Sequence, residues 1–149
     1  MLAVRTATGL SRHWQTLACA LLAPAAAWVA LQGLHLPKAG PPAWPLLLWP
    51  LLAAPLLEEW VLRSLLQQGL QQRLGDRWRA RPAAMAASVG ASCAFALLHA
   101  PAHGLDALWW LVPGLALAEL WRREQRLLPC VVLHAWFNAC LLVVGWPGT

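Results

Sequence analysis

Three apolar segments of the sequence contain polar and charged side chains that could carry out acid–base chemistry. These residues are Glu58, Glu59, Arg63, His99, His134 and Asn138. An ionised side chain near the centre of a bilayer costs ~2.5–3.5 kcal/mol on insertion scales, so such residues persist mainly where they serve a function. We therefore predict that the six side chains form one functional site.

The spacing of these residues predicts which of them share a helix face. Glu59 and Arg63 are four residues apart and can pair, whereas Glu58 is rotated by about 100° around the helix axis. When two carboxylates are adjacent, an arginine can hold one ionised while the other acts as a base. His134 and Asn138 share the four-residue spacing and are suited to stabilise an oxyanion. The pattern predicts a hydrolase that activates water without a nucleophilic Ser or Cys.

Less specific interpretations of the same residues stay open. Glu59 and Arg63 would then only neutralise each other, and each histidine would be an interhelical hydrogen-bonding group. A zinc site would use Glu and His ligands, but the sequence lacks HExxH, and Asn138 is a poor zinc ligand. We therefore predict a site with no metal and no other cofactor.

The remaining polar residues are assigned to helix ends and packing contacts. Ser88 and Ser92 lie among Ala and Gly and are interpreted as small packing residues. Glu119, close to two arginines, and His103 are interpreted as interfacial residues, and the glutamine-rich stretch at 67–72 as a helix that extends into the cytoplasm. The cysteines lie in apolar runs without a CxxC pair and are interpreted as free thiols.

The composition predicts a membrane protein. Hydrophobic residues make up 60% of the 149 residues and charged residues 11%, against roughly 45–50% and 25% in soluble domains. This composition excludes a disordered chain and argues against a soluble globule. A helix of about 20 apolar residues spans a bilayer. The sequence predicts an all-α, polytopic transmembrane helix bundle of about five spans, at 14–36, 44–66, 82–100, 107–120 and 127–146.

The basic residues predict the orientation of this bundle. Apart from Arg63, every arginine precedes the first predicted span or lies in the second-to-third or fourth-to-fifth connection, so all fall on one side. Lys38 is the only basic side chain in the opposite connections, histidines aside. By the positive-inside rule the N-terminus is cytoplasmic and the C-terminus outside. We expect a multi-pass protein of the inner (plasma) membrane, and attribute the arginines to topology rather than to nucleic-acid binding.

Three short motifs resemble a known family. The chain reads EExxxR at Glu58–Arg63, FxxxH at Phe95–His99 and HxxxN at His134–Asn138. In this order, on three predicted spans, the motifs resemble those of the CAAX protease and bacteriocin-processing family, also called CPBP or Abi. The resemblance covers about 50–144 of a single membrane domain at 1–149, and the span at 14–36 lies outside it.

The resemblance implies a glutamic-type intramembrane endopeptidase. Glu58 then matches the glutamate that activates water, Glu59 its partner carboxylate, and Arg63 the basic residue of the motif. His99 matches the histidine that helps to hold the water, and the third motif supplies the oxyanion-stabilising pair. The expected partners are the lipid bilayer and a membrane-anchored protein or peptide substrate.

The substrate expectation comes from composition and family resemblance. Abundant Arg, Ala, Leu and Trp with a single Lys fit a GC-rich bacterial gene, in which prenylated CAAX substrates are not expected. The chain is short for the family and resembles small members such as myxosortase-like enzymes and the protease of the JDVT-CTERM system. We therefore expect processing of C-terminal sorting tails. The alternatives are a non-catalytic immunity or partner-binding scaffold on the same fold, and an ion pathway.

Overall fold

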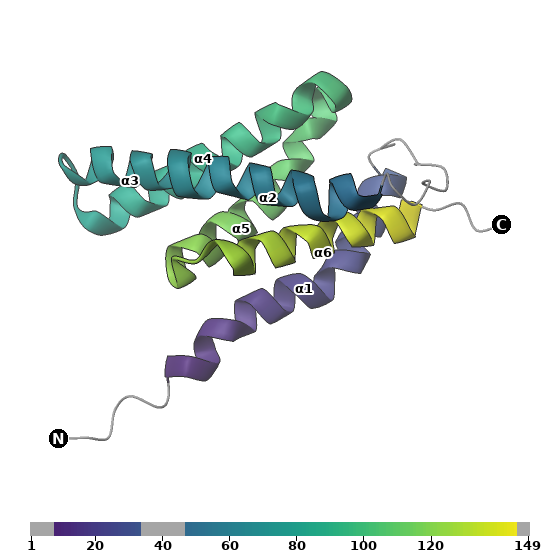
Figure 1. Cartoon of the computed structure of the whole chain (residues 1–149), viewed down its shortest axis with the longest axis horizontal. Coiled ribbons are helices and arrows are strands. Elements are labelled where there is room, and N and C mark those ends of the chain that lie inside the picture. Colours follow the sequence, from purple (N-terminus) through teal and green to yellow (C-terminus); the bar gives the residue numbers. More distant parts are fainter. Residues whose placement is uncertain (1–7, 34–46, 146–149) are drawn as a thin grey trace.

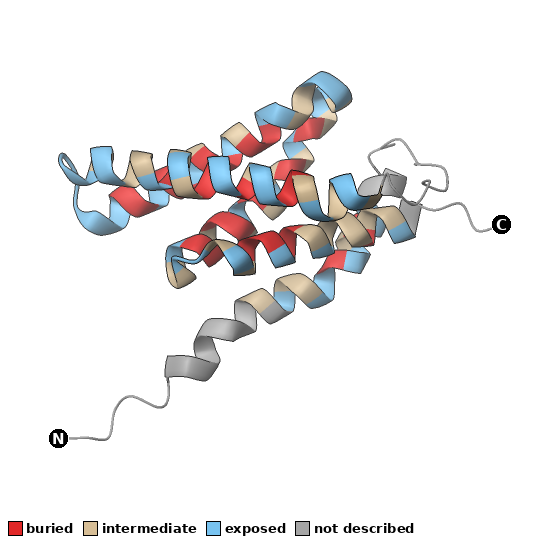
Figure 2. Cartoon of the chain, viewed as in Figure 1, coloured by how far each residue is buried: buried red, intermediate tan, exposed pale blue. Residues whose placement is uncertain are grey.

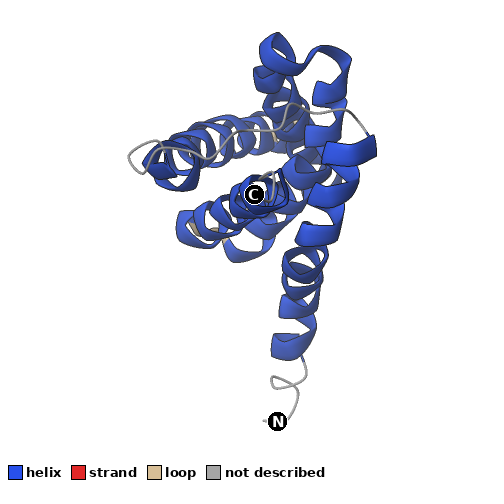
Figure 3. Cartoon of the chain, turned by 90° about the vertical axis from the view of Figure 1, so that its right-hand side faces the viewer, coloured by secondary structure: helices blue, strands red, loops and turns tan. Residues whose placement is uncertain are grey.

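The computed structural model describes residues 8–33 and 47–145, and these residues form helices and short turns (Figures 1 and 3). No strand occurs in the described ranges, in agreement with the predicted all-α class. The elements in chain order are α1 (Thr8–Gly33), η2 (Trp49–Ala53), α2 (Ala54–Glu59), η3 (Trp60–Gln67), α3 (Gln68–Gly75), α4 (Ala80–His103), η4 (Gly104–Trp110), α5 (Leu111–Glu124) and α6 (Leu127–Gly145).

The helices correspond to the predicted apolar segments, with two differences at their ends. The helix that begins at Trp49 continues past the predicted end of the second span at 66. It ends at Gly75, after the polar segment α3. The interval 101–106 between the third and fourth predicted spans contains the expected change of direction, but α4 extends into it: the helix includes Pro101, and the chain bends at Gly104, whose φ of 56° suits a residue without Cβ. The predicted boundaries at Leu36, Trp44 and Trp146 lie outside the described residues.

Membrane-spanning character is clearest in one part of the chain. The helical stretch Ala80–Glu124 is long and apolar enough to cross a membrane, and it contains the bend at Gly104. Two further apolar helices among the described residues, Ala18–Val29 and Leu127–Val143, are shorter. The number of crossings therefore stays a prediction.

Small residues allow the helices to pack closely around a buried centre. The interior face of α4 consists largely of alanine and serine, which let neighbouring backbones approach. Helix α4 packs against α5, η3 and α3, while α6 packs against α1 and α2. Figure 2 shows the buried residues on the faces that these helices turn toward one another.

Both arginine-rich connections lie at the same end of the bundle. Figure 1 shows the turn between α3 and α4 and the turn between α5 and α6 on the left, where α1 also begins. The long helix from η2 to α3 runs opposite to α6 in this view. The arginine-rich turns therefore share one end of the bundle, and the orientation of that end stays a prediction.

The helix that carries the glutamates is widened on both sides of them. In η2 and η3, π-type hydrogen bonds link residues five apart: the N–H of Ala54 donates to Trp49, and that of Gln68 donates to Arg63. Pro55 contributes to this geometry because it has no N–H to donate. Such π segments are rare and occur frequently at functional sites.

Candidate active site

Glu59 is the centre of a buried group of charged and polar side chains. Its Oε2 accepts a hydrogen bond of 2.8 Å from Nε of Arg63, and neither side chain is exposed. Its Oε1 lies 3.0 Å from Nδ1 of His134 on α6. Because a carboxylate accepts, the proton on that side of the imidazole belongs to Nδ1. Glu59 therefore connects two helices and fixes the orientation of the His134 ring.

Arg63 is held by partners on two elements besides Glu59. Nη1 donates to Oε1 of Gln67 at 3.3 Å, and Nη2 donates to the backbone oxygen of Gly114 at 3.3 Å. Gln67 is itself fully buried and donates to Oγ of Ser88 at 3.1 Å and to the oxygen of Ala118 at 2.9 Å. The expectation that Gln67 belongs to a cytoplasmic extension is therefore wrong. The helix without buried residues, α3, begins after it, at Gln68.

Close approach of α5 makes these contacts to backbone oxygens possible. Gly114 and Ala118 are four residues apart, so both lie on one face of α5. A Cβ at Gly114 would lie 3.1 Å from Cδ1 of Phe95 and 3.3 Å from Cα of Ser92. The missing Cβ at Gly114 thus lets α5 pack closely against α4, and in this arrangement Arg63 reaches the Gly114 carbonyl.

Glu58 lies beside this group with a different environment. Its side chain is 28% exposed, whereas that of Glu59 is not exposed. Oε2 of Glu58 lies 3.8 Å from Nε2 of His134. This oxygen is buried and has no hydrogen-bond partner within the described part of the chain. The two adjacent glutamates thus face the two nitrogens of the same imidazole.

His99 contacts the group through an aromatic ring. Phe95 makes edge-to-face contacts with both His99 and His134, at centroid distances of 4.9 and 5.4 Å. Nδ1 of His99 donates to the backbone oxygen of Phe95 at 2.9 Å, and its ring stacks on Trp110 at 4.9 Å. His103, expected at an interface, extends the same stack. His99 is thereby held one aromatic ring, that of Phe95, away from His134.

Asn138 lies one turn beyond His134 on α6 and contacts the glutamate helix. Its Nδ2 donates to the backbone oxygen of Pro50 at 2.7 Å. In η2 the donor five residues after Pro50 would be Pro55, which lacks an N–H. Asn138 therefore satisfies a carbonyl that the π-helix leaves without a main-chain donor. One of its two amide hydrogens is used in this way.

The described residues offer no evident metal cage. Within 8–33 and 47–145, no group of three His, Cys, Asp or Glu side chains has a metal-binding arrangement. Glu59, the most buried carboxylate, already has both oxygens engaged by Arg63 and His134. The donor set thus fits a proton-transfer site better than a cation site.

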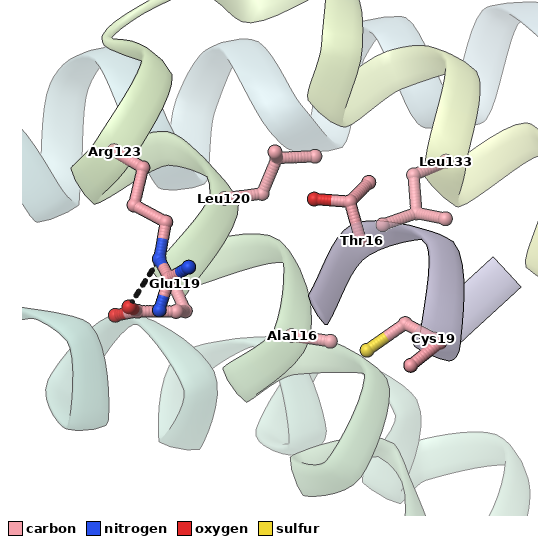
Figure 4. A pocket seen from close by; sticks show the side chains of 8 residues that line it. Thr16, Cys19, Ala116, Glu119, Leu120, Arg123 and Leu133 are labelled. Atoms are coloured by element: carbon pink, nitrogen blue, oxygen red, sulfur yellow. Dashed lines mark hydrogen bonds and ion pairs between the residues drawn. The ribbon is translucent and has the colours of Figure 1, made fainter. Parts of the chain in front are cut away.

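Two cavities open elsewhere, between α1 and the last two helices. One, of about 290 Å³, is lined by Thr16, Cys19, Glu119 and Arg123 among others (Figure 4). The other, of about 270 Å³, is lined mainly by apolar residues of α1, α5 and α6. Neither is lined by a glutamate or histidine of the buried group. At the first cavity Glu119 accepts hydrogen bonds of 2.6 Å from Arg122 and Arg123, the neighbourhood expected for it.

The structure thus brings together most of the predicted site and adds residues that the sequence analysis did not select. Glu59 bonds directly to Arg63 and His134, and Glu58 lies 3.8 Å from His134. His99 packs on Phe95, and Asn138 bonds to the Pro50 oxygen. The missed residues are Gln67, Ser88 and the small residues Gly114 and Ala118. The four-residue spacing from Glu59 through Arg63 to Gln67 was the available signal. Ser92 is buried and bonds only within its own helix among the described residues, as expected of a packing residue, whereas Ser88 also accepts a hydrogen bond from Gln67.

Comparison with known proteins identifies the family to which the chain belongs. A search of curated proteins and a search of solved structures each give no significant match. A family model described as type II CAAX prenyl endopeptidase, Rce1-like, matches residues 40–140. This range contains all three motifs and every residue of the buried group. The chain therefore belongs to the Rce1-like family of CAAX-type intramembrane proteases.

Proposed function

We propose that the chain is an intramembrane endopeptidase in which Glu58 activates a water molecule for attack on a peptide bond. The supporting observation is the 3.8 Å separation of Glu58 Oε2 from His134 Nε2. This distance is too long for a direct hydrogen bond, but one water molecule can bond to both atoms. Among residues 8–33 and 47–145 this carboxylate oxygen has no hydrogen-bond partner, which leaves it suited to accept a proton.

The orientation of His134 determines how that water is held. Because Nδ1 donates to Glu59, Nε2 of the neutral ring is an acceptor. The water then donates one hydrogen to Glu58 and the other to His134, and an oxygen lone pair points toward the substrate carbonyl. In this proposal His134 orients the nucleophile, a different role from the oxyanion contact that the family motif suggests.

Bond making and bond breaking follow from this arrangement. As the water oxygen bonds to the carbonyl carbon, Glu58 takes a proton and the carbonyl oxygen becomes an oxyanion. The second amide hydrogen of Asn138 is suited to stabilise that charge, with His99 bordering the site. When the C–N bond breaks, Glu58 returns the proton to the leaving amine, so one carboxylate serves as base and then as acid.

The substrate class is proposed on chemical grounds. A site enclosed by helices of a membrane protein suits a peptide bond close to an apolar span. We propose C-terminal tails of membrane-anchored proteins, built from a short motif, an apolar segment and a basic end. We further propose five spans with a cytoplasmic N-terminus, which puts the arginine-rich turns on the cytoplasmic side.

Purified enzyme in detergent micelles tests both parts of the proposal. The two probes are a single-span tail peptide of the kind just described and a farnesylated CAAX peptide, with products identified by mass spectrometry. Glu58→Gln should lower the rate by ~10²–10⁴-fold, the scale of general-base catalysis. Glu119→Gln is the matched control, because it alters a carboxylate in an ion-paired cluster away from the site.

Each contrary result removes a defined part of the proposal. If folded Glu58→Gln cleaves at the normal rate, Glu58 is not the base, and Glu59 becomes the candidate. Cleavage of the farnesylated peptide alone would reject sorting tails as the substrate class. If the wild-type enzyme cleaves neither probe, the scaffold alternative replaces the protease.

A further inference from the structure

Gln67 occupies an unusual position for an amide side chain in this bundle. It is fully buried, and its polar groups reach three different elements. Its Oε1 accepts from Arg63 on its own helix, while Nε2 donates to Ser88 on α4 and to the Ala118 oxygen on α5. A buried amide with such partners is held in one orientation, because each alternative leaves a polar atom unsatisfied.

The contacts of Gln67 continue to the glutamate pair in one unbroken series. Gln67 holds Nη1 of Arg63, the same guanidinium donates from Nε to Glu59, and Glu59 accepts from Nδ1 of His134. The nitrogen of His134 that faces Glu58 is therefore oriented by a series that begins at Gln67. Ser88 helps to hold Gln67, because the Ser88 hydroxyl accepts a hydrogen bond from Gln67 and donates one to the oxygen of Ala84.

The geometry of the helix explains why Glu59, Arg63 and Gln67, each four residues from the next, can lie on one side of it. In an α-helix each step of four residues advances about 40° around the axis, so Glu59 and Gln67 would diverge by about 80°. The π-type bonds of η3 widen the turn and reduce this drift. All three side chains, Glu59, Arg63 and Gln67, are consequently fully buried on the same side.

We propose that Gln67 is a positioning residue of the active site, acting through Arg63 on the orientation of Glu59 and His134. This proposal rests on the proposed protease function. It assigns to Gln67 no contact with substrate. Its removal leaves Arg63 bonded to Glu59 and to the Gly114 oxygen but without a partner for Nη1. The guanidinium, and through it the Glu59 carboxylate and the His134 ring, are then held less tightly in their orientation.

Gln67→Met tests the proposal because methionine retains the length and helix preference of glutamine without its hydrogen bonds. We expect kcat per folded enzyme on the tail peptide to fall by roughly 10–100-fold, since displacing a reacting group by about 1 Å has this scale of effect. KM should change little, because the side chain touches no substrate. Gln68→Met is the matched control, one residue further along and exposed.

A double variant distinguishes positioning from general structural support. In an Arg63→Lys background the planar guanidinium that joins Glu59 to Gln67 is absent. Gln67→Met should then cause little further loss of kcat, whereas an independent contribution would persist in full. Gln67→Glu gives a second single variant, which retains an acceptor for Arg63 but cannot donate to the Ala118 oxygen, and it should also lower kcat.

The outcomes separate this proposal from the proposed function. If wild-type enzyme cleaves the probe and both Gln67 variants match its kcat, the positioning role is rejected while the protease function stands. A Gln67→Met effect of equal size in the Arg63→Lys background also rejects it. If both Gln67 variants fail to accumulate while Arg63→Lys does, Gln67 is a folding residue and the proposal is wrong. If Glu58→Gln cleaves normally, the proposed base itself is refuted.

Discussion

Exchange of Arg63 for methionine should destabilise the bundle by about 3–5 kcal/mol, the cost of leaving a buried charge without its partner. Arg63 and Glu59 are both inaccessible, and their bond of 2.8 Å is the closest contact of either charge. The exchange also removes donors to Gln67 and to the Gly114 oxygen. Since 1.4 kcal/mol is a factor of ten, the folded-to-unfolded ratio should fall by roughly 10²–10⁴-fold.

The reciprocal and double variants reveal whether charge imbalance is the cause. Glu59→Gln leaves Arg63 as a buried cation and should cost a similar amount. Combining Arg63→Met with Glu59→Gln removes both charges, so the double variant should lose much less than the sum of the singles. Its cleavage activity should nonetheless stay low, because a neutral side chain at position 59 no longer holds the His134 ring as a carboxylate does.

Unfolding in detergent, followed by the fluorescence of the eleven tryptophans, measures these differences. Glu119→Gln is the control, because its partially exposed ion pairs should contribute no more than about 1 kcal/mol. The reasoning is refuted if Arg63→Met costs less than this control. It is equally refuted if the two single losses add fully in the double variant, since the charges would then not be coupled.

Three further predictions concern topology, metal and packing. A reporter fused after Thr149 should be active outside the cytoplasm if five spans follow a cytoplasmic N-terminus; cytoplasmic activity would overturn that count. Cleavage should survive EDTA and phenanthroline, because Glu59 is already committed to Arg63 and His134; loss on chelation with recovery on adding zinc would require a metallopeptidase mechanism. Gly114→Ala should lower stability by about 1–3 kcal/mol by forcing a Cβ against Phe95 and Ser92, whereas Gly69→Ala, with open space around it, should be neutral or slightly stabilising. Equal thermal midpoints for these two variants would contradict the close packing of α5.

The sequence was sufficient to predict the helical class and most of the charged site. Apolar runs indicated the helices, and the four-residue spacing correctly paired Glu59 with Arg63. The meeting of His134 with both glutamates could be expected only from the family motifs and the cost of polar groups in lipid. His134 lies 75 residues after Glu59, and residues so far apart in the chain carry no local signal of contact.

Other features depended on tertiary contacts that local patterns do not contain. Gln67 appears hydrophilic within a glutamine-rich stretch, and only α4 and α5 supply the partners that allow its burial. The third span was predicted to end at 100, before Pro101, but α4 includes this proline and ends at His103, because a proline near a helix end removes only one hydrogen bond. The π segments around the glutamates likewise involve Asn138, a residue 88 positions away from Pro50.

The two adjacent glutamates illustrate how environment divides chemical roles between identical side chains. One step along the helix places Glu59 against Arg63 and His134, where both its oxygens are engaged and the side chain is inaccessible. Glu58, one residue earlier, is partly exposed. One of its oxygens faces the other side of His134 and has no hydrogen-bond partner in the described part of the chain. A carboxylate with every acceptor engaged is suited to orient a neighbour, and one with a free acceptor is suited to take a proton. The proposal that Glu58 is the base is therefore supported by the contacts that Glu59 already makes, and the proposal for Gln67 extends that reasoning one turn further from the reacting atoms.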